Sequence, residues 1–246
     1  MNKLFIIIPA YNEEANILAV AREWHEIVVK TEPESRLLII DDGSKDNTYK
    51  IITELVKELP QLLPITKPNT GHGATLLFGY NYALEKDADY IFQTDSDGQT
   101  KPEEFWQFWE QKNSYSVLIG NRNHREDGFS RILVTKTLKI ILWCIFRLDI
   151  ADANAPFRLI QAETLRKHIS HIPHNYNLTN VMLTVLFVRY KESIKFLPIS
   201  FKKRQGGVNY INLKKIIKIG IKAVADFIRI KKDLDENILM ERKNEL

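Results

Sequence analysis

Short apolar runs alternate with amphipathic segments over the first 120 residues of the chain. The apolar runs predict strands at residues 4–8, 36–41, 62–66, 90–94 and 116–119. The amphipathic segments predict a helix capped by Asn12, a helix opened by Asp46 or Asn47, and helices at 73–84 and 102–111. Strands that alternate with helices are typical of a parallel sheet. The sequence therefore predicts an α/β fold, with a mainly parallel central sheet and helices on both faces.

The pattern changes after Gly120, where two basic amphipathic segments at 131–148 and 211–232 are expected to be helical. The expected division of the chain is therefore a catalytic domain at 1–210 and a basic helix with a tail at 211–246. Apolar faces bordered by Lys, Arg and Trp suit peripheral contact with a membrane. The alternative is a core helix with a solvated basic face. The apolar faces carry Val134, Leu138, Ile141 and Ile145 in the first segment, and Leu213, Ile217, Val224 and Phe227 in the second.

Composition narrows the class of protein. A chain of 246 residues with 44% hydrophobic and 27% charged residues is expected to be a soluble globular protein. No signal peptide or transmembrane helix is expected, and the single cysteine, Cys144, excludes an internal disulfide and suits the cytoplasm. Residues 202–232 hold ten Lys or Arg and one acid, Asp226, which indicates an anionic partner. Because the apolar residues there form a helical stripe without stacking aromatics, no nucleic acid is expected.

Polar clusters follow three of the expected strands, at residues 9–14, 41–44 and 95–99. In open α/β sheets, ligands bind beyond the carboxyl ends of the strands, so these clusters indicate a ligand site. Each cluster alone would also suit a turn or a helix cap. Asp95 and Asp97 lie two residues apart, so a local turn can aim both carboxylates at one hard cation, to which Gln99 adds a neutral oxygen. A diphosphate would supply the remaining ligands.

Two other ligand motifs fail at defined positions. An EF-hand loop counted from Asp95 would place Thr100 where glycine is required and Trp106 where the bidentate glutamate belongs. A dinucleotide fingerprint at residues 71–73 has Leu76 at its third glycine position and follows the third strand instead of the first. Neither a calcium-binding hand nor a dinucleotide fold is therefore expected.

Seven segments together resemble the family 2 glycosyltransferases of GT-A fold. The resemblance is strongest to the branch of dolichyl-phosphate mannose synthase and other polyprenyl-phosphate glycosyltransferases, and it runs from Leu4 to about Asn209. The segments are IIIPAYNEE at 6–14, DDGSKDNT at 41–48, NTGHGA at 69–74, DSDGQ at 95–99, GNR at 120–122, DANAPFRL at 152–159 and RQGGVN at 204–209.

The resemblance implies a role for each of these segments. It implies that Mg²⁺ or Mn²⁺ binds to Asp95, Asp97 and Gln99. It implies that Arg122, Arg131 and Arg204 meet phosphates of the donor or acceptor, which agrees with the bidentate geometry of guanidinium groups. The residues implied in binding the nucleotide-sugar donor are Pro9, Ala10, Tyr11, Glu13, Asp42, Gly71, Asp95 and Arg122. The residues implied in catalysis are Asp97, Asp152, Arg131 and Arg204.

The expected reaction is an inverting transfer of a sugar from a GDP- or UDP-sugar to a polyprenyl or dolichyl phosphate, at the inner face of the membrane. A lipid phosphate is already ionised and needs no strong base. The alternative acceptor, a saccharide hydroxyl in cell-surface polysaccharide synthesis, needs a general base, with Asp152 as the first candidate and Asp127 as the second.

The chain departs from the pattern of the polyprenyl-phosphate branch at two places. Ala155 and Pro156 replace a Ser-Gly pair that is frequent in this branch, and the charged tail at 233–246 stands where many members carry transmembrane helices. A non-catalytic nucleotide- or phospholipid-binding module is the other alternative, against which the intact Asp95–Asp97 cluster argues.

Overall fold

The computed structural model of the chain describes residues 2–125, 129–202, 220, 223–232 and 235–236, without the side chains of residues 123–125 and 129–134. Contacts within the chain define two compact units. The first unit comprises Met1–Gly128 with Ala151–Gly207, and the second comprises Phe129–Ile150 with Val208–Leu246. These units are not continuous stretches of chain like the two domains expected from the sequence, because residues 129–150 group with the C-terminal part.

One seven-stranded sheet forms the centre of the first unit, with strand order β3-β2-β1-β4-β6-β5-β7. Strand β6 pairs antiparallel with both of its neighbours, whereas the other pairs are parallel. The carboxyl ends of all strands except β6 therefore meet at one edge of the sheet. The strands are β1 Leu4–Ala10, β2 Arg36–Asp41, β3 Leu62–Thr66, β4 Tyr90–Gln93, β5 Val117–Arg125, β6 Arg158–Gln161 and β7 Ile194–Phe201.

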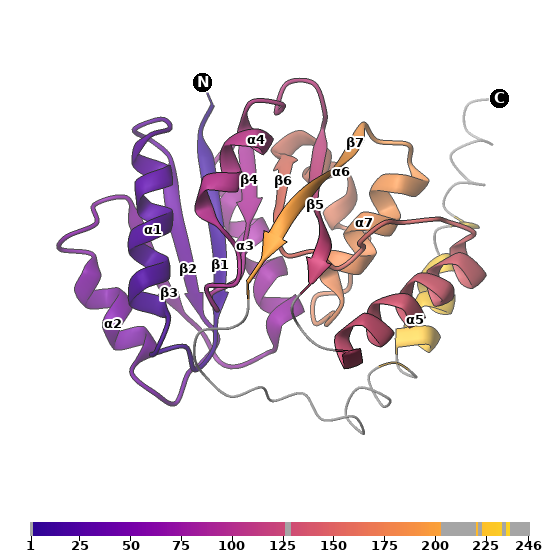
Figure 1. The fold of residues 1–246 in the computed structure, drawn as a ribbon, viewed down its shortest axis with the longest axis horizontal. Coiled ribbons are helices and arrows are strands. Elements are labelled where there is room, and N and C mark those ends of the chain that lie inside the picture. Colours follow the sequence, from indigo (N-terminus) through magenta and orange to yellow (C-terminus); the bar gives the residue numbers. More distant parts are fainter. Residues whose placement is uncertain (1, 126–128, 203–219, 221–222, 233–234, 237–246) are drawn as a thin grey trace. The chain divides into compact units, whose positions relative to one another are not determined.

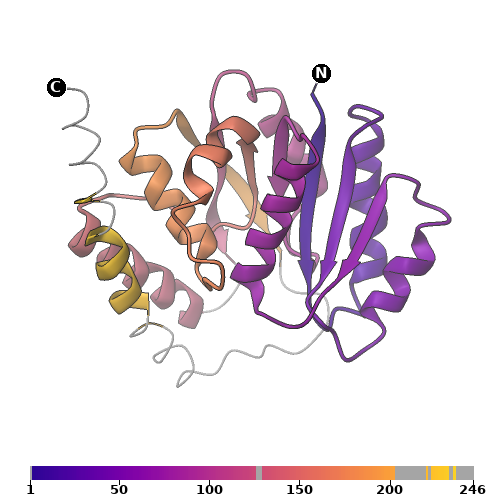
Figure 2. The same cartoon turned by 180° about the vertical axis from the view of Figure 1, so that it is seen from behind.

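Helices cover both faces of the sheet (Figures 1 and 2). Helices α1, α2 and α4 and the 3₁₀ helix η1 lie on one face, and α3, α6 and α7 lie on the other. On the first face, Trp24 of α1 packs 5.4 Å from the ring of Phe92, which lies 4.7 Å from the ring of Phe157. The α/β class with a mainly parallel sheet is thereby confirmed. The helices of this unit are α1 Ile17–Val29, α2 Thr48–Leu55, α3 His72–Glu85, η1 Pro102–Glu104, α4 Phe105–Trp109, α6 Ala162–Ile169 and α7 Thr179–Arg189.

The first five strands lie where the apolar runs predict them. The start of helix α1 differs from the prediction. Helix α1 begins at Ile17, and the expected cap Asn12 has a left-handed backbone with φ of 54°. The side-chain oxygen of Asn12 instead accepts a hydrogen bond from the amide of Lys45, 2.8 Å away. The prediction of Asn12 as the cap was therefore wrong, because a partner 33 residues away in the chain holds this side chain.

The second unit contains helix α5, Phe129–Phe146, close to the expected segment 131–148. Within this unit the ring of Phe146 lies 6.0 Å from the ring of Phe227. On α5, Ile140 is 63% exposed and Trp143 is 52% exposed. Of the second expected amphipathic segment, residues 211–219 and 221–222 lie outside the described residues, as do 237–246 of the tail. Within the described part of the chain, no helix combines the length and the apolar character needed to cross a bilayer.

Candidate active site

Three polar clusters meet at the carboxyl edge of the sheet because strand β1 lies between β2 and β4. Ala10 at the end of β1 pairs with Asp41 at the end of β2, and the amide of Asp42 donates to the carbonyl of Ala10 at 2.8 Å. On the other side of β1, the amide of Thr94 donates to the carbonyl of Ile7 at 3.1 Å, directly before Asp95. The topology thus brings together the clusters that the sequence places after separate strands.

The loop after β4 carries Asp95 and Asp97 on a tight turn. The hydroxyls of Thr94 and Thr100 lie 2.8 Å apart and close the base of the loop. Within it, one carboxylate oxygen of Asp97 accepts a hydrogen bond from the amide of Gln99 at 3.1 Å, and Gly98 adopts a φ of 70°. A side chain is rarely compatible with that φ, which accounts for the glycine. The Asp95 side chain remains 27% exposed, and its Oδ1 lies 3.9 Å from Nε2 of His72.

Gln99 is buried beneath this turn. Its side-chain amide nitrogen donates to the backbone carbonyl of Lys202 at 2.7 Å, and the backbone carbonyl of Gln99 accepts from the backbone amide of Lys202 at 2.8 Å. The two carboxylates and the amide oxygen of Gln99 are the oxygen donors that Mg²⁺ and Mn²⁺ prefer. Among the described residues there is no group of three or more His, Cys, Asp or Glu side chains placed to hold a metal. The expected ligand set needs only two carboxylates, since a diphosphate would supply further oxygens.

The first cluster closes the β1 end of the site. Glu13 is buried; its amide donates to the Thr48 hydroxyl at 2.8 Å, and its carboxylate accepts from the Asn16 side chain at 2.7 Å. Pro9 and Ala10 form the last residues of β1, and Tyr11 follows with 38% exposure. This arrangement fixes the backbone after β1 and leaves the Tyr11 ring open to solvent.

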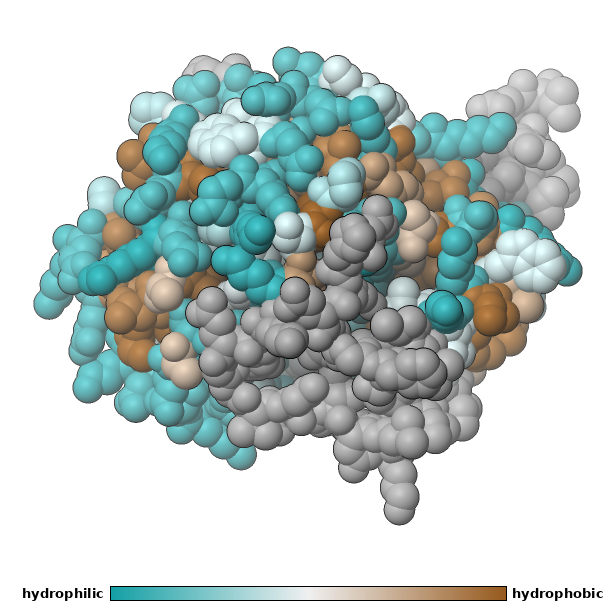
Figure 3. Space-filling model, in the orientation of Figure 1, coloured by the Kyte–Doolittle hydropathy of each residue, from teal (hydrophilic) through white to brown (hydrophobic). Residues whose placement is uncertain are grey.

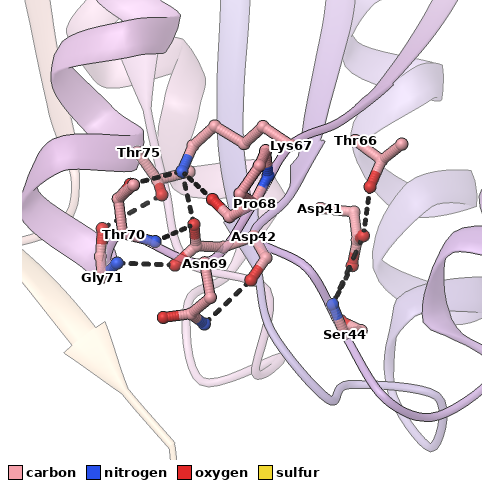
Figure 4. Close-up of polar contacts among 10 residues, drawn as sticks. All are labelled: Asp41, Asp42, Ser44, Thr66, Lys67, Pro68, Asn69, Thr70, Gly71 and Thr75. Atoms are coloured by element: carbon pink, nitrogen blue, oxygen red, sulfur yellow. Dashed lines mark hydrogen bonds and ion pairs between the residues drawn. The ribbon is translucent and has the colours of Figure 1, made fainter.

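Asp42 holds the neighbouring loop in place (Figure 4). Its carboxylate is buried, forms an ion pair with Lys67, and accepts hydrogen bonds from the amides of Thr70 and Gly71, each at 2.9 Å. Burial by itself raises the pKa of the Asp42 carboxyl, but the hydrogen bonds from Lys67 and Thr70 outweigh it and lower this pKa below its ordinary value. Asp42 therefore shapes the site by anchoring Gly71, whose φ is 91°.

The anchored Gly71 leads directly into helix α3. The hydroxyl of Thr179, at the start of α7, donates to the carbonyl of Gly73 at 2.8 Å. A Cβ atom added to Gly73 would lie 2.4 Å from backbone atoms of Asn177. The first turn of α3, which places His72 beside Asp95, is therefore fixed from two sides.

Arg122 and Asp152 lie together although 30 residues separate them. The guanidinium of Arg122 donates to both carboxylate oxygens of Asp152, at 2.7 and 2.8 Å, and the two side chains are 9% and 6% exposed. Both oxygens of the Asp152 carboxylate are therefore already engaged by the guanidinium. The pairing argues against a general base at Asp152, which a hydroxyl acceptor would need.

Comparison with known proteins places the chain in a family. The model of the family described as "Glycosyl transferase family 2" matches residues 5–178. The chain belongs to this family. It is 27% identical over 217 residues to the polyprenol monophosphomannose synthase of Mycolicibacterium smegmatis, covering 84% of this chain and 80% of that protein. It is also 26% identical over 214 residues to the undecaprenyl-phosphate mannosyltransferase of Micrococcus luteus, covering 83% of this chain and 86% of that protein. The protein is therefore a glycosyltransferase.

Solved structures confirm the GT-A fold of this family 2 glycosyltransferase. The glucosyl-3-phosphoglycerate synthase of Mycobacterium tuberculosis, in complex with Mn²⁺, UDP-glucose and phosphoglyceric acid, superposes with a TM-score of 0.71 over 94% of this chain and 80% of that one. The two sequences are 15% identical, so the likeness concerns the fold alone.

Not every residue expected in the site of this glycosyltransferase is described. Arg131 lies in α5, but its side chain is outside the described residues, as are Asp127 and Arg204. Conversely, the structure adds residues that sequence reasoning did not assign to the site, namely Lys67, His72 and Arg158. Both His72 and Arg158 lie in segments that carry the family resemblance, which is the signal that could have found them.

Proposed function

We propose that this glycosyltransferase transfers a sugar from a GDP- or UDP-sugar to a polyprenyl phosphate, with Mg²⁺ or Mn²⁺ bound by Asp95, Asp97 and Gln99. The observation that carries the proposal is the closed turn after β4, which holds two acidic side chains beside the ends of β1 and β2. The similarity to proteins named for mannosyl transfer to polyprenol and undecaprenyl phosphate supports this acceptor class.

The proposed mechanism is an inverting displacement at the anomeric carbon. When bound, the cation would neutralise charge on the departing nucleoside diphosphate. Asp95 and Asp97 would hold it, and Gly71 and the backbone around Pro9, Ala10 and Tyr11, together with Glu13 and Asp42, would shape the nucleotide side of the site. A phosphate acceptor arrives ionised, so the chain has only to orient it, a role we assign to Arg131 and Arg204. The engagement of Asp152 by Arg122 favours such an acceptor over a saccharide hydroxyl.

A transfer assay tests this function. Purified protein with Mn²⁺ is incubated with GDP- and UDP-sugars, with undecaprenyl phosphate, dolichyl phosphate or a saccharide as the acceptor. We expect a glycolipid product with at least one polyprenyl phosphate, and loss of transfer on adding EDTA that excess Mn²⁺ restores. Transfer to the saccharide alone would contradict the proposed acceptor, and transfer that EDTA does not reduce would contradict the metal.

We propose further that the protein binds peripherally to the cytoplasmic face of the membrane through the exposed side of α5. Ile140 and Trp143 are exposed there beside Lys136 and Lys139, and the guanidinium of Arg147 lies 4.9 Å from the centre of the Trp143 ring. Figure 3 shows hydrophobic and hydrophilic surface side by side in this region. Exposed apolar side chains flanked by bases suit the boundary between acyl chains and anionic headgroups.

Vesicle sedimentation tests the membrane contact. We expect the protein to sediment with vesicles of phosphatidylcholine and phosphatidylglycerol at low salt and to be released at high salt, because salt screens the attraction between bases and headgroups. Ile140→Ser combined with Trp143→Ser should weaken this binding several-fold. Leu18→Ser is the matched control, since Leu18 of α1 is also exposed, at 43%. Equal sedimentation of the double variant and the parent would contradict a role for α5.

A further inference from the structure

Arg158, the first residue of β6, is fully buried beneath the site. All of its hydrogen bonds run to neutral acceptors. Its guanidinium donates to the carbonyls of Ala155 at 2.7 and 3.1 Å, Ala153 at 3.3 Å and Asn180 at 3.1 Å, and to the hydroxyl of Thr184 at 3.4 Å. A buried cation is costly unless it is compensated, so a residue of this kind in the core calls for an explanation.

The acceptors show what Arg158 holds. Two of them belong to Ala153–Ala155, the loop directly after Asp152, and the Thr184 hydroxyl of α7 also lies 3.0 Å from the Ala153 carbonyl. Asp152 itself is held by Arg122. Two arginines therefore hold the loop at 152–155. Arg122 binds the side chain of Asp152, and Arg158 binds the backbone carbonyls of Ala153 and Ala155.

The position of Arg158 in the sheet connects this loop to the rest of the site. Arg158 pairs with Gln93 of β4, two residues before Asp95, and with Ile119 of β5, three residues before Arg122. Arg158 thus lies in the sheet between the strand that leads to Asp95 and the strand that carries Arg122. Burial lowers the pKa of the Arg158 guanidinium, while Tyr80 and the carboxylates of Asp152 and Asp95 act on it through space in the opposite direction. A guanidinium stays protonated at neutral pH, so the charge is permanent.

We infer that Arg158 is a positioning residue for the acceptor side of the transfer site. It holds the carbonyls of Ala153 and Ala155 and so sets the place of the Asp152–Arg122 pair relative to Asp95. This inference rests on the proposed function in one respect, namely that loop 152–155 faces the acceptor. Arg158 is buried and does not touch a substrate itself.

Arg158→Lys tests the inference, because lysine keeps the charge but lacks the planar fork that reaches both carbonyls. We expect kcat/KM for the polyprenyl phosphate to fall roughly tenfold to a hundredfold, as a displaced acceptor group would cause. The KM for the nucleotide-sugar and the calorimetric Kd of the nucleoside diphosphate with Mn²⁺ should stay within about twofold. Arg22→Lys is the matched control, since Arg22 of α1 lies on the surface in an ion pair with Glu58.

Hydrogen exchange gives a readout that does not depend on turnover. In Arg158→Lys, the amides of residues 153–155 and 157 should exchange faster, while those of 94–100 keep their protection. Thr184→Val removes the hydroxyl that contacts both Arg158 and the Ala153 carbonyl, and it should give a smaller change in the same peptides. This variant replaces Arg158→Lys in the test if Arg158→Lys does not fold. Equal losses for donor and acceptor, or unchanged exchange at 153–157, would overturn the inference. The wild-type protein is assayed first. If it transferred sugar to no polyprenyl phosphate, that result would refute the proposed acceptor and not the role of Arg158.

Discussion

Asp97→Asn is expected to lower the kcat for sugar transfer at least about a hundredfold while leaving the fold intact. Asparagine has nearly the same shape as aspartate and keeps the oxygen that accepts from the Gln99 amide, so the turn after β4 should persist. What the substitution removes is a negative charge, and a hard cation binds a neutral amide oxygen more weakly than a carboxylate.

Three measurements check this prediction. Transfer should be nearly lost, the affinity of the nucleoside diphosphate in the presence of Mn²⁺ should fall, and the melting temperature should change little. Asp87→Asn is the matched control, because Asp87 lies exposed in the turn before β4, at the opposite edge of the sheet, and has a left-handed φ of 54° that asparagine also tolerates. Normal turnover by Asp97→Asn would remove Asp97 from the proposed metal site.

The parallel half of the fold could be predicted because its signals are local. Buried strands such as β1 and β2 contain runs of consecutive apolar residues, and the polar clusters come at or directly after their ends. Strand β6 could not be found in this way. It has four residues, begins with the buried Arg158, and pairs antiparallel to its neighbours. Strand β7 is also obscured, since it lies at the edge of the sheet and contains Lys195 and Pro198.

In the candidate site too, local features could be predicted from the sequence and contacts between distant residues could not. Its acidic clusters could be predicted because strand ends in a parallel sheet share one edge. The contacts among side chains could not, because they join residues far apart in the chain. Asp42 meets Lys67 across 25 residues, and Arg122 meets Asp152 across 30. The resemblance made Asp152 a candidate base, and its contact with Arg122 could not be read from the sequence.

Gly73→Ala is expected to cost about 2–3 kcal/mol of stability and to weaken donor binding as well. The added Cβ would lie 2.4 Å from backbone atoms of Tyr176 and Asn177. Backbone atoms cannot move away by a side-chain rotation, so the clash is not relieved locally. The first turn of α3 would have to move, and with it Gly71, which Asp42 anchors, and His72, which lies beside Asp95. A loss of this size corresponds to a fall in melting temperature of roughly 4–12 °C.

Two other glycines of the chain separate the effect on stability from the effect on the site. At Gly79, in the middle of α3, a Cβ would lie 2.6 and 2.7 Å from side-chain methyl groups of Ile40 and Ile7. Gly79→Ala should therefore lower the melting temperature less and leave the Kd of the nucleoside diphosphate with Mn²⁺ unchanged. At Gly220 a Cβ would have no neighbour within 4 Å among the residues that the structure describes, so we expect Gly220→Ala to change neither quantity. If Gly73→Ala lowered stability while donor affinity stayed at the parent value, the first turn of α3 would not belong to the donor site.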